Sequence, residues 1–191
     1  LLAIVAGGEQ HVEVTTPEIL QEIASLWRRL NLQIGVPLVD IQHLWLIKMV
    51  VGMDAAMGAS QLTRDAVLAQ TINEAVAYID VHFRTEEELM RVIGYDRMDQ
   101  HSQTHRKFEE FVRLRRADLV SGNRRAAMTL VNDLRSWLTN HIAIEDKQLA
   151  QFYRDNREAA LAFSKESILS GRAKVRKNQL NLYTKIVKEG A

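Results

Sequence analysis

Apolar side chains recur along this chain at intervals of three and four residues, which is the spacing of one face of an α-helix. The first such stretch, residues 18–30, follows a helix start in which Thr16 precedes Pro17. Four longer stretches with the same spacing occupy residues 40–57, 63–93, 98–119 and 124–153. Turn-forming segments separate these four at residues 58–60, 94–96 and 121–123. The pattern therefore predicts one short helix followed by four long ones.

The sequence contains no alternating pattern of useful strand length, so we expect an all-α fold. Four long helices joined by short connections are typical of an antiparallel, up-and-down four-helix bundle. We place this bundle at residues 34–153, after an N-terminal extension with a helix at residues 1–33. Residues 154–191 again show apolar positions at helical spacing, which predicts a helical tail outside the bundle.

Charge is distributed unevenly between the predicted bundle and the tail. The 191 residues carry a formal net charge of +1, but the tail contains nine basic and four acidic side chains. Because aromatic residues do not interleave with these charges, the tail favours docking on the bundle or on a partner subunit over binding nucleic acid or anionic lipid. The apolar run of six residues at the N-terminus is far shorter than the roughly 20 residues that span a bilayer. We expect a cytoplasmic protein with neither a nucleic-acid nor a membrane partner.

Histidine carries the candidate chemistry, because the chain has no cysteine. This absence excludes disulfides, thiolate metal sites and thiol catalysis. Five of the six histidines fall on the apolar faces of the four predicted bundle helices: His43, His82, His101, His105 and His141. The sixth, His11, precedes the first helix, and we expect it to be a surface residue.

Two carboxylates accompany these histidines at short spacing. Residues four apart share one face of an α-helix, so Glu86 can point the same way as His82. His101 and His105 form a second pair at this spacing. Asp146 lies five residues after His141, an offset that turns about 140° around an α-helix. We therefore expect Asp146 to reach sideways or to bridge, rather than to pair with His141 on one metal.

Each of these residues alone has an ordinary structural explanation, such as a hydrogen-bonded core histidine or a pair on a helix surface. Taken together, five imidazoles and two carboxylates buried without partners would cost several kcal/mol. A pair of divalent metal ions relieves that cost, and nitrogen-rich ligation without sulfur favours iron, zinc, copper or nickel over magnesium or calcium. Ser102 replaces the glutamate that a zinc protease motif requires, and no Glu precedes a histidine by three residues as in ferritin-like di-iron proteins.

Four segments that contain these residues resemble the signature blocks of hemerythrins, especially bacteriohemerythrins. They are residues 35–43, 82–87, 101–105 and 137–146, within a resemblance that covers roughly residues 27–153. The resemblance implies two iron ions joined by an oxo or hydroxo bridge. It further implies ligation of one iron by His101, His105 and His141, of the other by His43 and His82, and of both by Glu86 and Asp146.

The resemblance also implies a function. Hemerythrins bind dioxygen reversibly as peroxide at an open position on the iron that has two histidine ligands. We therefore expect an oxygen carrier or store rather than an enzyme. The terminal helices support a different hypothesis, in which the chain is an oxygen or redox sensor domain of a larger signalling protein, or joins a homo-oligomer or an effector domain. A di-iron enzyme that handles peroxide or nitric oxide is a further hypothesis, although no dedicated acid or base is apparent.

Overall fold

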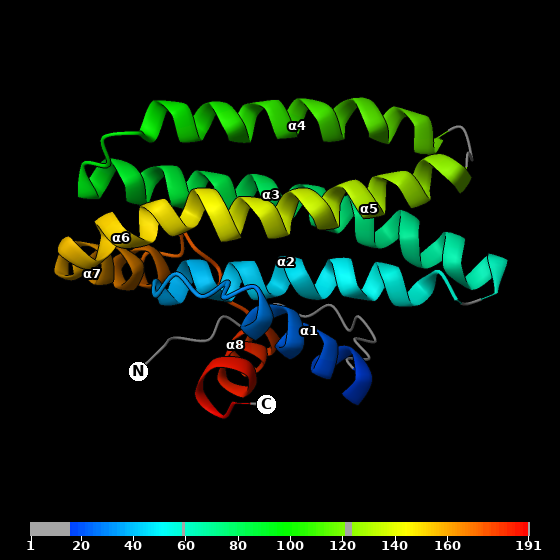
Figure 1. Ribbon diagram of the computed structural model, residues 1–191, viewed down its shortest axis with the longest axis horizontal. Helices are drawn as coiled ribbons and strands as arrows, with labels where there is room; N and C mark the ends of the chain where they lie inside the picture. Colours follow the sequence, from blue (N-terminus) through cyan, green and yellow to red (C-terminus); the bar gives the residue numbers. More distant parts are fainter. Residues whose placement is uncertain (1–15, 59, 121–123, 191) are drawn as a thin grey trace.

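The computed structural model describes residues 16–58, 60–120 and 124–190, and helices account for nearly all of them (Figure 1). In chain order they are α1 (Pro17–Arg29), α2 (Pro37–Ala56), α3 (Gln61–Ile93), α4 (Met98–Val120), α5 (Arg124–Asn140), η1 (His141–Asp146), α6 (Lys147–Asp155), α7 (Arg157–Leu169), α8 (Lys177–Tyr183) and η2 (Thr184–Lys188). No strand occurs in these described ranges. The predicted all-α fold is confirmed. His11 lies outside the described residues.

Helices α2 to α5 form the predicted antiparallel bundle (Figure 1). Each helix packs against its two neighbours in the cyclic order α2, α3, α4, α5 and back to α2. The fifth stretch differs from a single α-helix, because α5 continues through the π-helical segment η1 into α6. This continuous rod ends at Asp155, two residues beyond the predicted limit of the bundle.

The first two helices show how local sequence sets their starts. Thr16 caps α1, where its Oγ1 accepts a hydrogen bond from the Ile19 amide at 3.4 Å. Helix α2 begins at Pro37, three residues earlier than predicted. The reason is Asp40, whose buried carboxylate accepts hydrogen bonds from the amides of Ile34 at 2.8 Å and Gly35 at 3.0 Å. Asp40 thus lies within the first turn of α2 and holds the preceding loop against it.

Helix α2 is the most enclosed helix of the bundle. Of its 20 residues, 14 are buried, including apolar side chains on all of its faces. Helices α1 and α8 cover the side of α2 that the bundle leaves open, as Figure 1 shows below α2. Burial of this additional apolar surface by the terminal helices explains why α2 lacks the polar face of a typical bundle helix.

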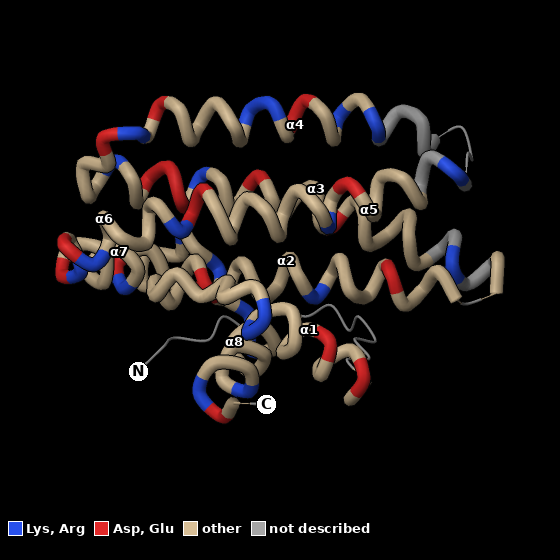
Figure 2. The backbone as a smooth tube through the Cα atoms, viewed as in Figure 1, with Lys and Arg blue, Asp and Glu red and all other residues tan. Residues whose placement is uncertain are grey.

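The tail docks on the bundle. Helix α7 packs against α3, and α8 packs against α2, where Leu182 and Ile186 of the last helical segments are buried. Arg172, between them, forms ion pairs with Glu88 of α3 at 3.8 Å and with Glu166 at 2.8 Å. Figure 2 shows acidic and basic residues interspersed along α7. Among the described helices, none is long and apolar enough to cross a membrane.

Candidate metal centre

The bundle brings the seven candidate ligands together in its interior. His43 comes from α2, and the other six are supplied by α3, α4 and η1. No candidate is more than 3% exposed to solvent: His43, His82, Glu86, His101, His105, His141 and Asp146. The apolar faces that predicted helix packing therefore also deliver these polar side chains into the core.

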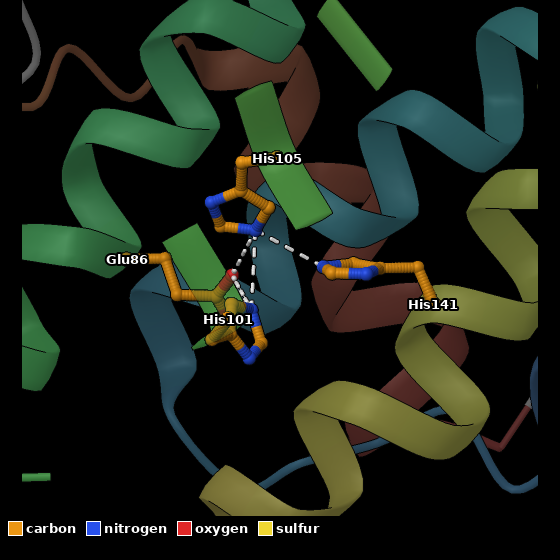
Figure 3. A group of neighbouring side chains, drawn as sticks. All are labelled: Glu86, His101, His105 and His141. Carbon is orange, nitrogen blue, oxygen red and sulfur yellow. Dashed lines mark hydrogen bonds and ion pairs between the residues drawn. The ribbon is translucent and has the colours of Figure 1, made fainter. Parts of the chain in front are cut away.

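Three histidines converge at one end of this cluster. Nε2 of His105 lies 3.1 Å from Nε2 of His101 and 3.1 Å from Nε2 of His141. Oε2 of Glu86 lies 3.4 Å from Nε2 of His101 and 3.4 Å from Nε2 of His105 (Figure 3). We call Glu86, His101, His105 and His141 the three-histidine group; their donor atoms all lie within 4.8 Å of one another.

Two histidines occupy the other end. Nε2 of His43 lies 3.1 Å from Oδ2 of Asp146, and Nε2 of His82 lies 4.0 Å from Oε2 of Glu86. The two imidazole rings meet edge to face, with centroids 4.7 Å apart. We call His43, His82, Glu86 and Asp146 the two-histidine group, whose donor atoms also lie within 4.8 Å of one another.

Both carboxylates contact both ends of the cluster. Glu86 belongs to both groups. Asp146 belongs to the two-histidine group, yet its Oδ1 lies 3.1 Å from Nε2 of His141 and 3.4 Å from Nε2 of His101. The two groups are therefore adjacent halves of one site that share their anionic donors.

The contact between Asp146 and His141 corrects one expectation from the sequence. Residues five apart should diverge on an α-helix, but His141 to Asp146 form a π-helical segment. In a π-helix each turn closes from residue i to i+5, which brings such residues back to nearly the same face. The divergence predicted from α-helical geometry is therefore wrong at this turn, and both side chains point into the site. Single π turns of this kind are frequent at functional sites.

The donor atoms fit metal ions better than they fit one another. Both ring nitrogens of His43, Nε2 of His82 and all four carboxylate oxygens of Glu86 and Asp146 lack a hydrogen-bond partner. Buried polar atoms without partners are rare and costly. Neighbouring nitrogens in the three-histidine group lie 3.1 Å apart, a separation that two metal–nitrogen bonds of about 2.1 Å can span. Five imidazoles and two carboxylates without sulfur suit iron or a similar transition metal.

Burial and mutual charge set the protonation states. Burial raises the pKa of Glu86, but contacts with the neighbouring imidazoles outweigh it and hold this pKa well below its usual range. The pKa of Asp146 is also lowered by neighbouring imidazoles, against burial and the charge of Glu86. Burial, reinforced by His43, lowers the pKa of His82 to about 3. Burial also acts to lower the pKa of His43, but the two carboxylates outweigh it and raise this pKa. The lowered pKa values favour ionised Glu86 and Asp146 and a neutral His82, which are the forms that bind metal.

Side chains behind the candidate ligands orient two of the imidazoles. The amide oxygen of Gln42 lies 3.3 Å from Nδ1 of His82, and its Nε2 donates to Oγ1 of Thr85 at 3.2 Å. Glu87 lies 3.1 Å from Nδ1 of His105. Such partners fix the ring orientation of a ligand. Sequence analysis missed Gln42 and Thr85, and their position next to His43 and Glu86 in the chain was the only signal.

Aromatic rings enclose the three-histidine group. Phe83 stacks on His105 with ring centroids 3.8 Å apart, and Trp137 stacks on His141 with centroids 4.3 Å apart. Phe83 also meets Trp137 edge to face at 5.6 Å. These ring faces limit the freedom of the two imidazoles.

Comparison with known proteins agrees with this geometry. A model of the hemerythrin HHE cation binding domain matches residues 35–153, a stretch that contains all seven candidate ligands. The chain belongs to the hemerythrin family.

Bacteriohemerythrins and a myohemerythrin are among its relatives. The bacteriohemerythrin of Stenotrophomonas maltophilia (strain R551-3) is 33% identical over 124 residues, which cover 63% of this chain and 76% of that protein. The bacteriohemerythrin of Pseudomonas paraeruginosa (strain DSM 24068 / PA7) is 31% identical over 120 residues, or 61% of this chain and 73% of that protein. The myohemerythrin of Theromyzon tessulatum is 29% identical over 85 residues, or 44% of this chain and 65% of that protein. Each of these matches leaves part of the chain uncovered.

Proposed function

We propose that this hemerythrin-family chain holds two non-haem iron ions. In this proposal the imidazoles of His101, His105 and His141 bind one iron, those of His43 and His82 bind the other, and Glu86 and Asp146 bridge the two. One observation carries the assignment: each carboxylate is close to histidines of both groups. Two cations would also give partners to Nε2 of His43 and His82 and to the carboxylate oxygens of Glu86 and Asp146, which lack hydrogen-bond partners.

We further propose that the site binds dioxygen reversibly and acts as a carrier, a store or a sensor rather than as an enzyme. When bound, the iron pair supplies the electrons and the open coordination position that dioxygen binding requires. The chain supplies three imidazoles at one end and only two at the other, so the two-histidine end has one imidazole donor fewer. Both fully buried carboxylates of the centre are assigned as ligands, so neither is free to act as a general acid or base. The protein excludes water and keeps the donors in place.

Absorption spectroscopy with metal analysis tests this function. We expect about two iron ions per chain, since two donor groups are present. We also expect the reduced protein to gain a visible absorption band in air and to lose it reversibly under nitrogen. A protein loaded with two irons whose spectrum does not respond to dioxygen would contradict oxygen binding. A protein that takes up a single ion would contradict the proposed bridging.

Contacts of the terminal helices favour a sensor as the second candidate function. Helix α8 packs on α2, which carries His43 and Gln42, and α7 packs on α3, which carries His82 and Thr85. In this proposal residues 34–153 are the oxygen-binding unit, and the segments 1–33 and 154–191 respond to its state. Hydrogen exchange tests this coupling. We expect protection of α7 and α8 to differ between the reduced and oxidised protein, and identical protection would argue for a carrier or store.

A further inference from the structure

A surface groove between α4 and the continuous rod of α5 and η1 adjoins the metal centre. Its volume is about 580 Å³. Of the seven candidate ligands, His141 alone lines this groove. The side chain of His141 is only 1% exposed, and its Nδ1 is buried without a hydrogen-bond partner. The groove therefore leads from the surface to a buried candidate ligand with an unused polar atom.

The charge of the groove favours a cation. Two carboxylates, those of Asp133 and Glu145, line it against a single guanidinium, that of Arg115, so the lining carries a net negative charge. Both carboxylates belong to the rod, as His141 does, whereas Arg115 belongs to α4 and lies over the ring of Phe111. Negative charge therefore lies on the wall of the groove that also carries the candidate ligand.

The rod places polar groups in a row along this wall. Ser136 and Asn140 follow Asp133 at steps of three and four residues, which keeps all three on one face of the helix. Glu145 lies roughly 18 Å farther along the rod than Asp133, at about 1.5 Å per residue, and His141 lies between them. The two carboxylates are thus too far apart to hold one ion together. They can attract an ion at successive points of a path.

The charge of Glu145 is felt inside the three-histidine group. Burial acts to lower the pKa of His101, but the two shared carboxylates and the charge of Glu145 outweigh it and raise this pKa. A cation that approaches along the groove meets the same negative field. The attraction therefore increases towards the metal centre.

A second groove, between α3 and α7, lacks these properties. Its volume is about 240 Å³, and its charged lining consists of Arg84, Arg172 and Glu88. None of the seven candidate ligands lines it. Because its lining carries a net positive charge and offers no ligand of the centre, this groove does not suit a metal ion. Of the two grooves, only the one beside η1 combines the right charge with access to a ligand.

We propose that the groove between α4 and the rod is the route by which hydrated iron(II) enters the metal-free protein, drawn by Asp133 and Glu145 towards His141. The inference rests on the proposed function, because it concerns how the iron pair is acquired. Oxygen atoms along the path, from carboxylate, hydroxyl and amide groups, replace water around the ion. The imidazoles of the three-histidine group then bind it more tightly, since nitrogen ligands suit iron better than oxygen ligands alone.

Trp137 covers the inner end of this route. Its indole stacks on the Phe108 ring, with centroids 3.6 Å apart, and on the imidazole of His141, with centroids 4.3 Å apart. Nε2 of His141 faces the other candidate ligands, so an ion from the groove reaches it only after the stack loosens. The indole therefore slows both the entry and the loss of iron, whereas the two carboxylates speed entry.

The rate of iron uptake tests the two carboxylates. Metal-free protein is mixed with ferrous sulfate under nitrogen, and the iron still open to a fast chelator is measured at successive times. We expect Asp133→Asn combined with Glu145→Gln to slow uptake by about 3- to 10-fold at low salt. The effect should nearly vanish at about 1 M salt, because salt screens the charges. Asp155→Asn combined with Glu158→Gln is the matched control, since both side chains are exposed and do not line the groove.

A substitution of Trp137 should act in the opposite direction. We expect Trp137→Leu to speed both uptake and loss of iron to a chelator by about 3- to 10-fold, the change in rate that the loss of one aromatic stack gives. Trp137→Phe, which keeps a smaller ring, should have a lesser effect of the same sign, and it replaces the leucine variant if that variant does not fold. Trp45→Phe in α2 is the matched control, since Trp45 does not line the groove.

The rate of uptake and the final amount of bound iron separate this route from the proposed function. A wild-type uptake rate in the variant of Asp133 and Glu145, equal slowing in its control, or slowing that persists at high salt would overturn the route. A protein that takes up no iron would overturn the route and the proposed function together. Two bound ions that do not respond to dioxygen would overturn oxygen binding alone. Slowing that depends on salt, with normal final iron content, would support the route.

Discussion

The two halves of the bundle differ in what covers them. Helices α2 and α3 carry His43 and His82, and the terminal helices α1, α7 and α8 pack on this pair. Helix α4 and η1 carry His101, His105 and His141, and together with α5 they border a surface groove lined by Phe111 and Trp137. Figure 1 shows α4 at the edge of the molecule farthest from α1 and α8.

This difference suggests a division of roles within one site. The covered half, formed by α2 and α3, carries two of the five imidazoles. It adjoins α7 and α8, the helices that a sensor would move. The open half has the more complete donor set, and stacked rings connect it to the surface. Small changes in the packing of α7 and α8 are therefore expected to reach His43 and His82. Glu86 and Asp146 contact histidines of both halves, so a substitution of either carboxylate tests this division of roles most directly.

The largest effect is expected from Glu86→Gln. Its carboxylate belongs to both donor groups, so replacement by a neutral amide should weaken metal binding in both halves and leave little bound iron. Iron per chain, measured by metal analysis after gel filtration, checks this. Glu87→Gln is the neighbouring control, because its carboxylate contacts only the far nitrogen of His105 and glutamine can still accept that hydrogen bond. Full iron content in Glu86→Gln would contradict the shared-ligand assignment.

A smaller effect is expected from removing the cover of α2. Leu182 of α8 is buried, so Leu182→Ala should lower the free energy of unfolding by about 2–5 kcal/mol through lost packing and a residual cavity. Leu169→Ala removes the same atoms from a residue that is 59% exposed and should change stability by about 0.5 kcal/mol or less. Denaturant unfolding of both variants measures the difference. Equal stabilities would mean that the tail does not contribute to the fold as its packing indicates.

The smallest effect is expected from a substitution of Gln42, whose amide oxygen contacts the imidazole of His82 on the side away from the other candidate ligands. Gln42→Leu removes the hydrogen-bond partner of His82 at similar volume and should weaken iron binding by about 10- to 100-fold, as for other partners behind metal ligands. The rate of iron loss to a chelator measures this change. Gln70→Leu on the exposed surface of α3 is the matched control. If both variants lose iron at the wild-type rate, the amide of Gln42 does not hold the imidazole in place.

Local sequence was enough for much of the fold. Thr16 and Pro17 marked the start of α1, because capping and a fixed proline φ act within a single turn. The spacing of His101 and His105 placed both imidazoles on one helix face, since four residues make about one turn of an α-helix. The same rule failed at His141 and Asp146, because it assumes an α-helix and this turn is a π-helix.

By itself, the sequence determined the helical architecture, the absence of thiol chemistry and the placement of two residue pairs, His82 with Glu86 and His101 with His105, each on one helix face, because these follow from residue type and α-helical periodicity. Only the tertiary structure decided that the tail covers α2, that Gln42 supports His82, and that stacked rings join a groove to His141. These features arise from contacts between residues far apart in the chain. Periodicity identifies which face of a helix is buried, whereas packing decides what that face meets.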